Sequence, residues 1–309
     1  MVVLLAGALP VYAQTAAEDN SAPVAAYTLK IPVDEVRLTF HAQDIEGHAV
    51  HDLRLEELNL LDNGKPPRKI LAFQAMPDLP IHAGFLIDTS PSMSQDLGLN
   101  RSIAMRYVQH VLRQQTDQAF VMDFAFASEV EQAWTSKDNE LAGGVAHPPA
   151  YGGIHTRGTA LYDAVYRACL NQFGHLDPAH SGNFILLFSD GEDNASRATF
   201  QQAVDMCQRN HTSIYTFRPR PNMEYGSAGA RILADFARET GGHAFSDSES
   251  DAEIETDLRG IESDLRNQYL VVYRPAEIKH DGGFHRVELQ APKRVSSISV
   301  RSGYYAPIR

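Results

Sequence analysis

A short segment in the first third of the chain has the residue types and the spacing of a metal site. It reads Asp88-Thr89-Ser90-Pro91-Ser92, so that an aspartate and two serines occupy alternate positions. In an extended chain this spacing points the three side chains in the same direction. One carboxylate and two hydroxyls then provide the oxygen ligands that a hard divalent cation prefers.

The elements around this segment place it at the edge of a sheet. The apolar run from Ile81 to Ile87 predicts a buried strand that ends at Asp88. A second apolar run, Phe184 to Phe188, leads into Ser189 and Asp190. In open α/β sheets, ligands bind at the carboxyl ends of the strands. We therefore expect Asp190 to lie at the same edge as Asp88, although such an acid is also typical of a solvated turn.

Thr159 is a further candidate ligand. It follows a loop rich in Gly, His and Pro that runs from Gly143 to Gly158, and a helical pattern comes after it. The alternative interpretation is that Thr159 caps this helix at its N-terminus, as Thr often does.

Together the three segments resemble the von Willebrand factor type A domain and its metal-ion-dependent adhesion site. The strings Leu-Ile-Asp-Thr-Ser-Pro-Ser-Met, Gly-Thr-Ala-Leu-Tyr-Asp-Ala and Phe-Ser-Asp-Gly-Glu-Asp-Asn are similar to the secreted bacterial branch of that family. The resemblance covers roughly residues 80–268 and implies a Rossmann-like domain that binds proteins and is not an enzyme. It implies five metal ligands: Asp88, Ser90, Ser92, Thr159 and Asp190.

The chemistry of these five residues favours magnesium. Asp88 and Asp190 bring two negative charges, and three hydroxyls add oxygens without charge. Mg²⁺ accepts such a set and retains waters, Mn²⁺ has similar chemistry, and Ca²⁺ is possible but usually takes more carboxylates. The resemblance further implies that an open coordination position accepts a Glu or Asp carboxylate from a partner protein. Arg157 either steers that carboxylate or is a solvated loop residue.

Two other functions stay open on the sequence alone. A metal-dependent hydrolase or phosphatase of the haloacid-dehalogenase type needs a second acid two residues after the first, and position 90 is Ser. The chain contains neither a Gly-x-Ser-x-Gly motif nor a Gly-x-x-x-x-Gly-Lys phosphate loop. The other alternative is a structural domain that binds metal incidentally.

Composition and the N-terminus bound the class of protein. The 309 residues are 43% hydrophobic and carry a net charge of −12, which argues against nucleic acid as a partner. Residues 1–13 predict a signal peptide, and hence export to the periplasm or the exterior of the cell, and residues 14–27 predict a linker. No run is long enough to span a membrane, and the oligomeric state is not indicated.

The pattern of strands and helices predicts two architectures. Residues 79–268 alternate strand and helix, which predicts a doubly wound, mostly parallel α/β sheet. The flanks, residues 28–78 and 269–309, are β-rich and each too small to fold alone. We therefore expect them to form one β-sandwich-like domain together, with separate small sheets as the alternative. Asp62-Asn63-Gly64 predicts a hairpin between the runs 58–61 and 69–73.

The two cysteines, Cys169 and Cys207, each fall on the apolar face of a predicted helix. We expect buried free thiols, with a disulfide as the alternative if the protein is exported.

Overall fold

The structure is a computed structural model. It describes residues 35–110, 112–148, 158–176, 181–218, 228–246, 251–277 and 280–306. The predicted signal peptide, the predicted linker and Arg157 lie outside these residues. Among the helices in the described ranges, none has the length and apolar character needed to cross a membrane.

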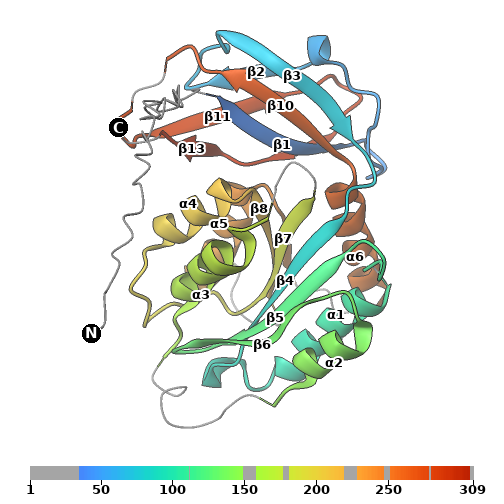
Figure 1. Cartoon of the computed structure of the whole chain (residues 1–309), viewed down its shortest axis with the longest axis vertical. Coiled ribbons are helices and arrows are strands. Elements are labelled where there is room, and N and C mark those ends of the chain that lie inside the picture. The colour runs from blue at the N-terminus through green and yellow to red at the C-terminus, as the bar shows by residue number, and fades with distance from the viewer. Residues whose placement is uncertain are drawn as a thin grey trace, which may run out of the picture. The chain divides into compact units, whose positions relative to one another are not determined.

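A six-stranded sheet lies at the centre of the α/β part (Figure 1). In spatial order its strands are β6 (Ser128–Thr135), β5 (Gln118–Phe124), β4 (Ile81–Asp88), β7 (Gly182–Phe188), β8 (Thr212–Arg218) and β9 (Ala244–Ser246). All neighbours are parallel except β5 and β6. Strands β4 and β7 are mostly apolar and are buried along almost their whole length because helices cover both faces.

Helices pack on the two faces of this sheet and create two hydrophobic cores. One face carries α1 (Leu97–His110), α2 (Asp138–Ala146) and α6 (Asp251–Arg266). The other carries α3 (Leu161–Arg167), the π-helical turn η4 (Ala168–Phe173), α4 (Phe200–Arg209) and α5 (Ala228–Thr240). The predicted doubly wound fold is therefore confirmed. Helix α2 was not predicted, because two glycines weaken its pattern, yet Leu141 and Val145 are fully buried.

The two flanks of the chain form a β-sandwich. One sheet has the order β12 (Ser297–Val300), β1 (Val36–Gln43), β10 (Gln268–Arg274), β3 (Lys69–Met76). The other has the order β13 (Gly303–Tyr305), β11 (Phe284–Gln290), β2 (Asn59–Asp62). Each sheet contains strands from both flanks, and their side chains share one core. The predicted joint domain is therefore confirmed. The described ranges also contain two 3-10 helical turns, η1 (Leu55–Glu57) and η2 (Pro91–Met93).

The predicted hairpin between residues 58–61 and 69–73 is wrong. A tight turn does form, with positive φ at Asn63 and Gly64 and one bridge between Asp62 and Lys65. After it the chain crosses to the other sheet, so that β2 pairs with β11 while β3 pairs with β10. Local turn chemistry fixed the turn, and burial between two sheets decided the pairing.

The expectation of free thiols is also wrong. Cys169 and Cys207 form a disulfide, with Cα atoms 5.0 Å apart. Each residue does face the core as predicted, and both are fully buried. The sequence could not show that η4 and α4 lie side by side on the same face of the sheet, which is what brings the sulfurs together.

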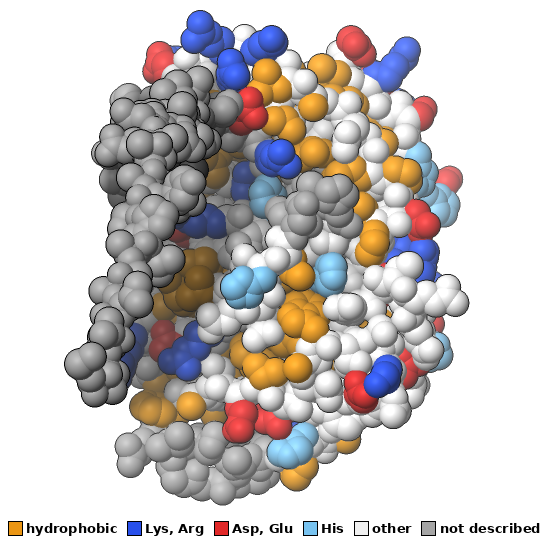
Figure 2. Space-filling view, viewed as in Figure 1, with side chains coloured by type: hydrophobic (Ala, Val, Ile, Leu, Met, Phe, Trp, Pro, Cys, Tyr) orange, Lys and Arg blue, Asp and Glu red, His pale blue; other side chains and the backbone are white. Residues whose placement is uncertain are grey.

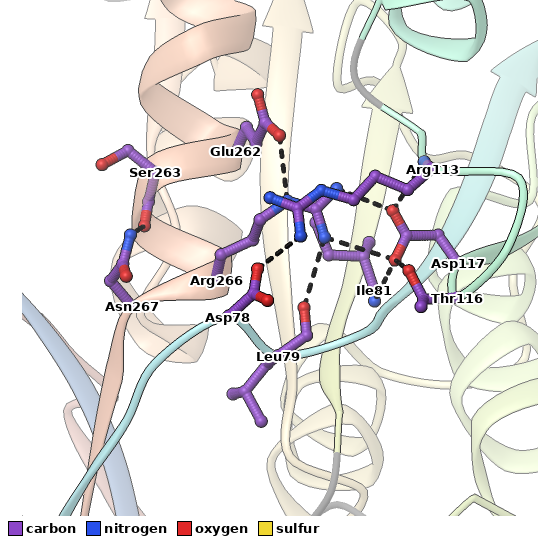
Figure 3. Close-up of polar contacts among 10 residues, drawn as sticks. All are labelled: Asp78, Leu79, Ile81, Arg113, Thr116, Asp117, Glu262, Ser263, Arg266 and Asn267. Carbon is purple, nitrogen blue, oxygen red and sulfur yellow. Dashed lines mark hydrogen bonds and ion pairs between the residues drawn. The ribbon is translucent and has the colours of Figure 1, made fainter.

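A buried ion pair lies where the sheet begins, next to the connection from the sandwich (Figure 3). Arg266, at the end of α6, donates to both carboxylate oxygens of Asp117 at 3.2 and 2.7 Å. The same carboxylate accepts the backbone N–H groups of Ile81 and Arg113, at 2.9 and 2.8 Å. The backbone N–H of Leu79 donates to the carbonyl of Arg266, which ties the connection to α6.

Candidate metal site

Asp88 is the last residue of the central strand β4 and is fully buried. Strand β4 lies between β5 and β7, and the strand order continues from β5 toward one edge of the sheet and from β7 toward the other. Asp88 therefore lies at the topological switch point of the sheet. One carboxylate oxygen accepts the backbone N–H of Ser90 at 2.9 Å, and the other accepts the Ser189 hydroxyl at 2.7 Å. These bonds fix the orientation of the carboxylate.

The two serines follow immediately in the turn that leads to η2. Their hydroxyl oxygens lie 3.1 Å apart, so they point to the same place. Ser90 is buried, whereas Ser92 is exposed. Pro91 begins η2, which holds this turn with a bond from the Met93 N–H to the Ser90 carbonyl. The cluster therefore opens to solvent on the side of Ser92.

Backbone contacts connect Thr159 to the turn that carries Asp190. Its N–H donates to the side chain of Asn194 at 2.8 Å, and its carbonyl accepts the N–H groups of Asn194 and Ala195. The interpretation of Thr159 as a helix cap is wrong, because α3 begins at Leu161 with Ala160 as its cap residue. Gly158 is required beside it, because its φ is +131° and an added Cβ would lie 2.2 Å from the Asn194 side-chain oxygen.

Asp190 follows β7 and is 5% exposed. One of its carboxylate oxygens accepts the backbone N–H of Glu192 at 3.0 Å. It is close enough to Asp88 for its negative charge to act on that group. The structure thus brings Asp190 to the same edge as Asp88, as the sequence predicted.

The electrostatics of Asp88 fit a bound cation. Burial raises the pKa of this carboxyl to about 6, the hydrogen bonds from Ser90 and Ser189 lower it, and the nearby Asp190 raises it further. Besides burial, the largest influences on the pKa of Asp88 are thus two hydroxyls, one N–H and another carboxylate. A buried carboxylate normally pairs with a cation. The five residues offer oxygen ligands only, which suits Mg²⁺, Mn²⁺ or Ca²⁺.

Two positioning residues were not singled out in the sequence. Ser189 donates to Asp88 and accepts the N–H of Gly191, and Asn194 bonds Thr159 through both its side chain and its backbone. Both lie in the acidic turn that carries Asp190. Their types gave no signal, because serine and asparagine are ordinary in any turn.

A different acidic cluster occurs in the turn after β1. Asp44, Glu46 and His48 bring ligand atoms within 4.8 Å of one another, the one such trio of His, Cys, Asp or Glu in the described ranges. Asp44 uses one carboxylate oxygen to accept the N–H groups of Glu46 and His48. These bonds explain the cluster as a local turn, separate from the five predicted ligands.

A comparison with protein families shows to which family the chain belongs. The von Willebrand factor type A domain matches residues 84–259, more than half of the chain. The chain belongs to this family. The matched range begins within β4 and ends within α6, so it contains all five predicted ligands. A search of curated proteins found no match.

Solved structures with a similar fold share little sequence. The conserved hypothetical protein BatB from Bacteroides thetaiotaomicron is 16% identical with a TM-score of 0.46, over 59% of this chain and 97% of that one. An aerotolerance-related membrane protein from Bacteroides fragilis is 16% identical with a TM-score of 0.46, over 59% of this chain and 98% of that one. Proximal thread matrix protein 1 from the mussel byssus, with a zinc-occupied MIDAS motif, is 15% identical with a TM-score of 0.47. The similarity covers 60% of this chain and 48% of that one.

Proposed function

We propose that this von Willebrand factor type A domain binds a partner protein in a divalent-metal-dependent manner. Asp88, Ser90, Ser92, Thr159 and Asp190 would hold the ion, with Mg²⁺ favoured and Mn²⁺ or Ca²⁺ possible. When bound, the metal supplies positive charge and an open coordination position for a Glu or Asp carboxylate of the partner. We further propose that the protein is exported, with residues 1–13 as signal peptide and residues 79–268 as the binding domain.

The observation that carries this proposal is the environment of Asp88. Its carboxylate is fully buried and accepts the Ser90 N–H and the Ser189 hydroxyl, and no basic side chain of the described residues forms an ion pair with it. The opposite arrangement occurs at Asp117, where Arg266 neutralises the charge. A protein that leaves a buried carboxylate beside a second one without a cation of its own is suited to take a cation from solution.

The residues around the ion would have different roles in the site. Ser189 and the Ser90 N–H hold the Asp88 carboxylate in place, and Asn194 holds the backbone of Thr159. Ser92 lies on the exposed side, where a partner can approach.

Calorimetric titration tests the metal site. Wild type should bind one Mn²⁺ or Mg²⁺ with micromolar to millimolar affinity, roughly −4 to −8 kcal/mol. Asp88→Ala should abolish binding. Glu192→Gln is the matched control, because this exposed acid lies two residues from Asp190 and is not a proposed ligand. Its affinity should stay within about threefold of wild type. Equal affinity in Asp88→Ala and wild type would remove the proposed site.

Affinity capture tests the partner. Protein captured from the exported fraction of the source organism should bind in Mg²⁺ and be released by EDTA. Thr159→Ala should weaken capture in Mg²⁺ and keep the fold, because Thr159 holds its neighbours through backbone atoms that the substitution retains. Capture that persists unchanged in EDTA would show that the interaction does not pass through the metal.

A further inference from the structure

A second feature lies directly beside the proposed metal site. A pocket of about 190 Å³ is lined by Phe126, Ser128, Ala160, Arg167, Ala195 and Arg197, and we call it the arginine pocket. Ala160 follows Thr159, and the Ala195 N–H donates to the Thr159 carbonyl at 3.1 Å. The Ala160 N–H donates to the carbonyl of Ala125, next to Phe126. The pocket and the metal site therefore share one wall.

The charge of the arginine pocket is opposite to that of its surroundings. Arg167 and Arg197 are both exposed, and neither makes an ion pair with another residue of the described ranges. The acid in the lining, Asp163, directs one carboxylate oxygen at the backbone N–H groups of Arg197 and Ala198, at 3.1 and 2.8 Å. This carboxylate anchors the turn that presents Arg197. Two guanidinium groups against one occupied carboxylate leave the pocket positive.

A positive pocket is unexpected at this place. The chain carries a net charge of −12, and the adjacent turn holds Asp190, Glu192 and Asp193. Some surface arginines of this chain do pair with a nearby acid, as Arg209 pairs with Asp205 at 2.8 Å. Figure 2 shows that acidic and basic side chains lie next to one another at several places on the visible face of the molecule. Arg167 and Arg197, which form no ion pair within the part of the chain that the structure describes, provide donors in the fork geometry that binds carboxylates.

The size and the apolar wall of the pocket also restrict its ligand. At about 190 Å³ it is smaller than the cavities of about 300–1,000 Å³ that hold whole small molecules. Phe126 is 38% exposed and forms an apolar side. A single acidic side chain matches this combination, because its methylene groups can lie on the ring while its carboxylate meets the arginines.

We propose that the arginine pocket binds a second carboxylate of the same partner segment whose first carboxylate goes to the metal. This inference rests on the proposed function and makes it more specific: the partner presents an acidic stretch with two acids a few residues apart. Arg167 and Arg197 then determine which acidic segments are accepted. The metal site alone would not distinguish one exposed Glu or Asp from another.

Defined peptides test the inference. The probes are capped glycine-rich peptides with one glutamate, and a series with a second glutamate placed two to five residues after the first. Binding is followed by NMR shifts of the protein in Mg²⁺ and in EDTA. In Mg²⁺ at least one two-acid peptide should bind the wild type about three- to fivefold more tightly than the one-acid peptide, the size expected of exposed ion pairs. The gain should decrease at high salt.

The variants separate the pocket from the metal. Arg167→Gln combined with Arg197→Gln should lose the gain and keep the Mn²⁺ affinity of wild type. Arg209→Gln is the matched control on α4 and should keep the gain. If no two-acid peptide gains in wild type, or if the double variant keeps the gain, the inference is overturned and the proposed function stands. If the one-acid peptide binds equally in Mg²⁺ and EDTA, or no peptide binds, the proposed function itself is overturned.

Discussion

Each end of the central sheet contains a buried aspartate, and the pKa values of the two are shifted in opposite directions. At the start of the sheet, burial alone would raise the pKa of Asp117, but bonds from Arg266, Arg113 and Ile81 outweigh it and the pKa is lowered. At the carboxyl ends of the strands, burial raises the pKa of Asp88 to about 6, and a second acid lies nearby. Both side chains are almost completely buried, at 1% and 0% exposure.

This contrast separates a structural carboxylate from a functional one. The charge of Asp117 is satisfied within the chain, and it holds α6 and the connection to the sandwich together. The Asp88 carboxylate is held in position by hydrogen bonds, and no basic side chain in the described ranges forms an ion pair with it. Ionisable groups with strongly shifted pKa values occur more often at functional sites than elsewhere. Burial by itself therefore does not indicate which role an aspartate has, and its partners do.

Removing Asp117 should have the largest effect on folding. Asp117→Ala leaves Arg266 as an uncompensated buried charge, and we expect a loss of about 3–5 kcal/mol in the free energy of unfolding. Urea unfolding followed by circular dichroism measures it. Asp78→Asn removes an exposed charge that pairs with Arg113 and keeps a residue type that tolerates the positive φ of this position, so it should change stability by no more than about 0.5 kcal/mol. Similar losses in the two variants would contradict the structural role of Asp117.

A third buried acid, Asp123 on β5, sharpens the comparison through pH. Burial raises its pKa to about 7, Arg101 at 3.2 Å lowers it, and Glu131 raises it. Because the folded pKa lies above the unfolded value of 3.8, the folded protein holds this proton more tightly. The stability from this group is complete below pH 3.8 and is lost as pH rises to about 7.

Unfolding in EDTA as a function of pH tests this behaviour. Between pH 4 and pH 8, the free energy of unfolding of the wild type should fall by roughly 2–4 kcal/mol relative to that of Asp123→Asn, because the amide has no such proton to release. Asp205→Asn, at an exposed ion pair on α4, is the control and should follow wild type. A constant difference between Asp123→Asn and wild type across this range would show that Asp123 does not titrate there.

Asp88→Asn should have the smallest effect on stability in the absence of metal. The amide keeps the bond from the Ser90 N–H and removes a buried charge, so stability in EDTA at pH 7 should rise by between zero and about 1 kcal/mol. Adding Mg²⁺ at ten times its dissociation constant should stabilise wild type by about 1.4 kcal/mol and leave the variant unchanged. A loss of 2 kcal/mol or more in EDTA would place Asp88 with Asp117 as a structural acid.

The sequence determined the elements that have a clear period and the residues that end them. The apolar runs of β4 and β7 predicted buried strands, and Asp88 and Asp190 followed each of them. The alternating spacing of Ser90 and Ser92 predicted that their hydroxyls converge, and they lie 3.1 Å apart, although the 3-10 turn η2 and not an extended chain brings them together. These features depend on residues close in sequence, so local patterns are sufficient to predict them.

Contacts between distant residues were decided only by the tertiary structure. Asn63-Gly64 specified a turn, but not that β2 and β3 would enter different sheets. Cys169 and Cys207 each showed an apolar face, but not that η4 and α4 would be neighbours. Asp117 and Arg266 are 149 residues apart, and Arg167 and Arg197 come from a helix and a separate turn. Such pairs form because burying the faces of the sheets brings their elements together, and no local pattern encodes which elements become neighbours.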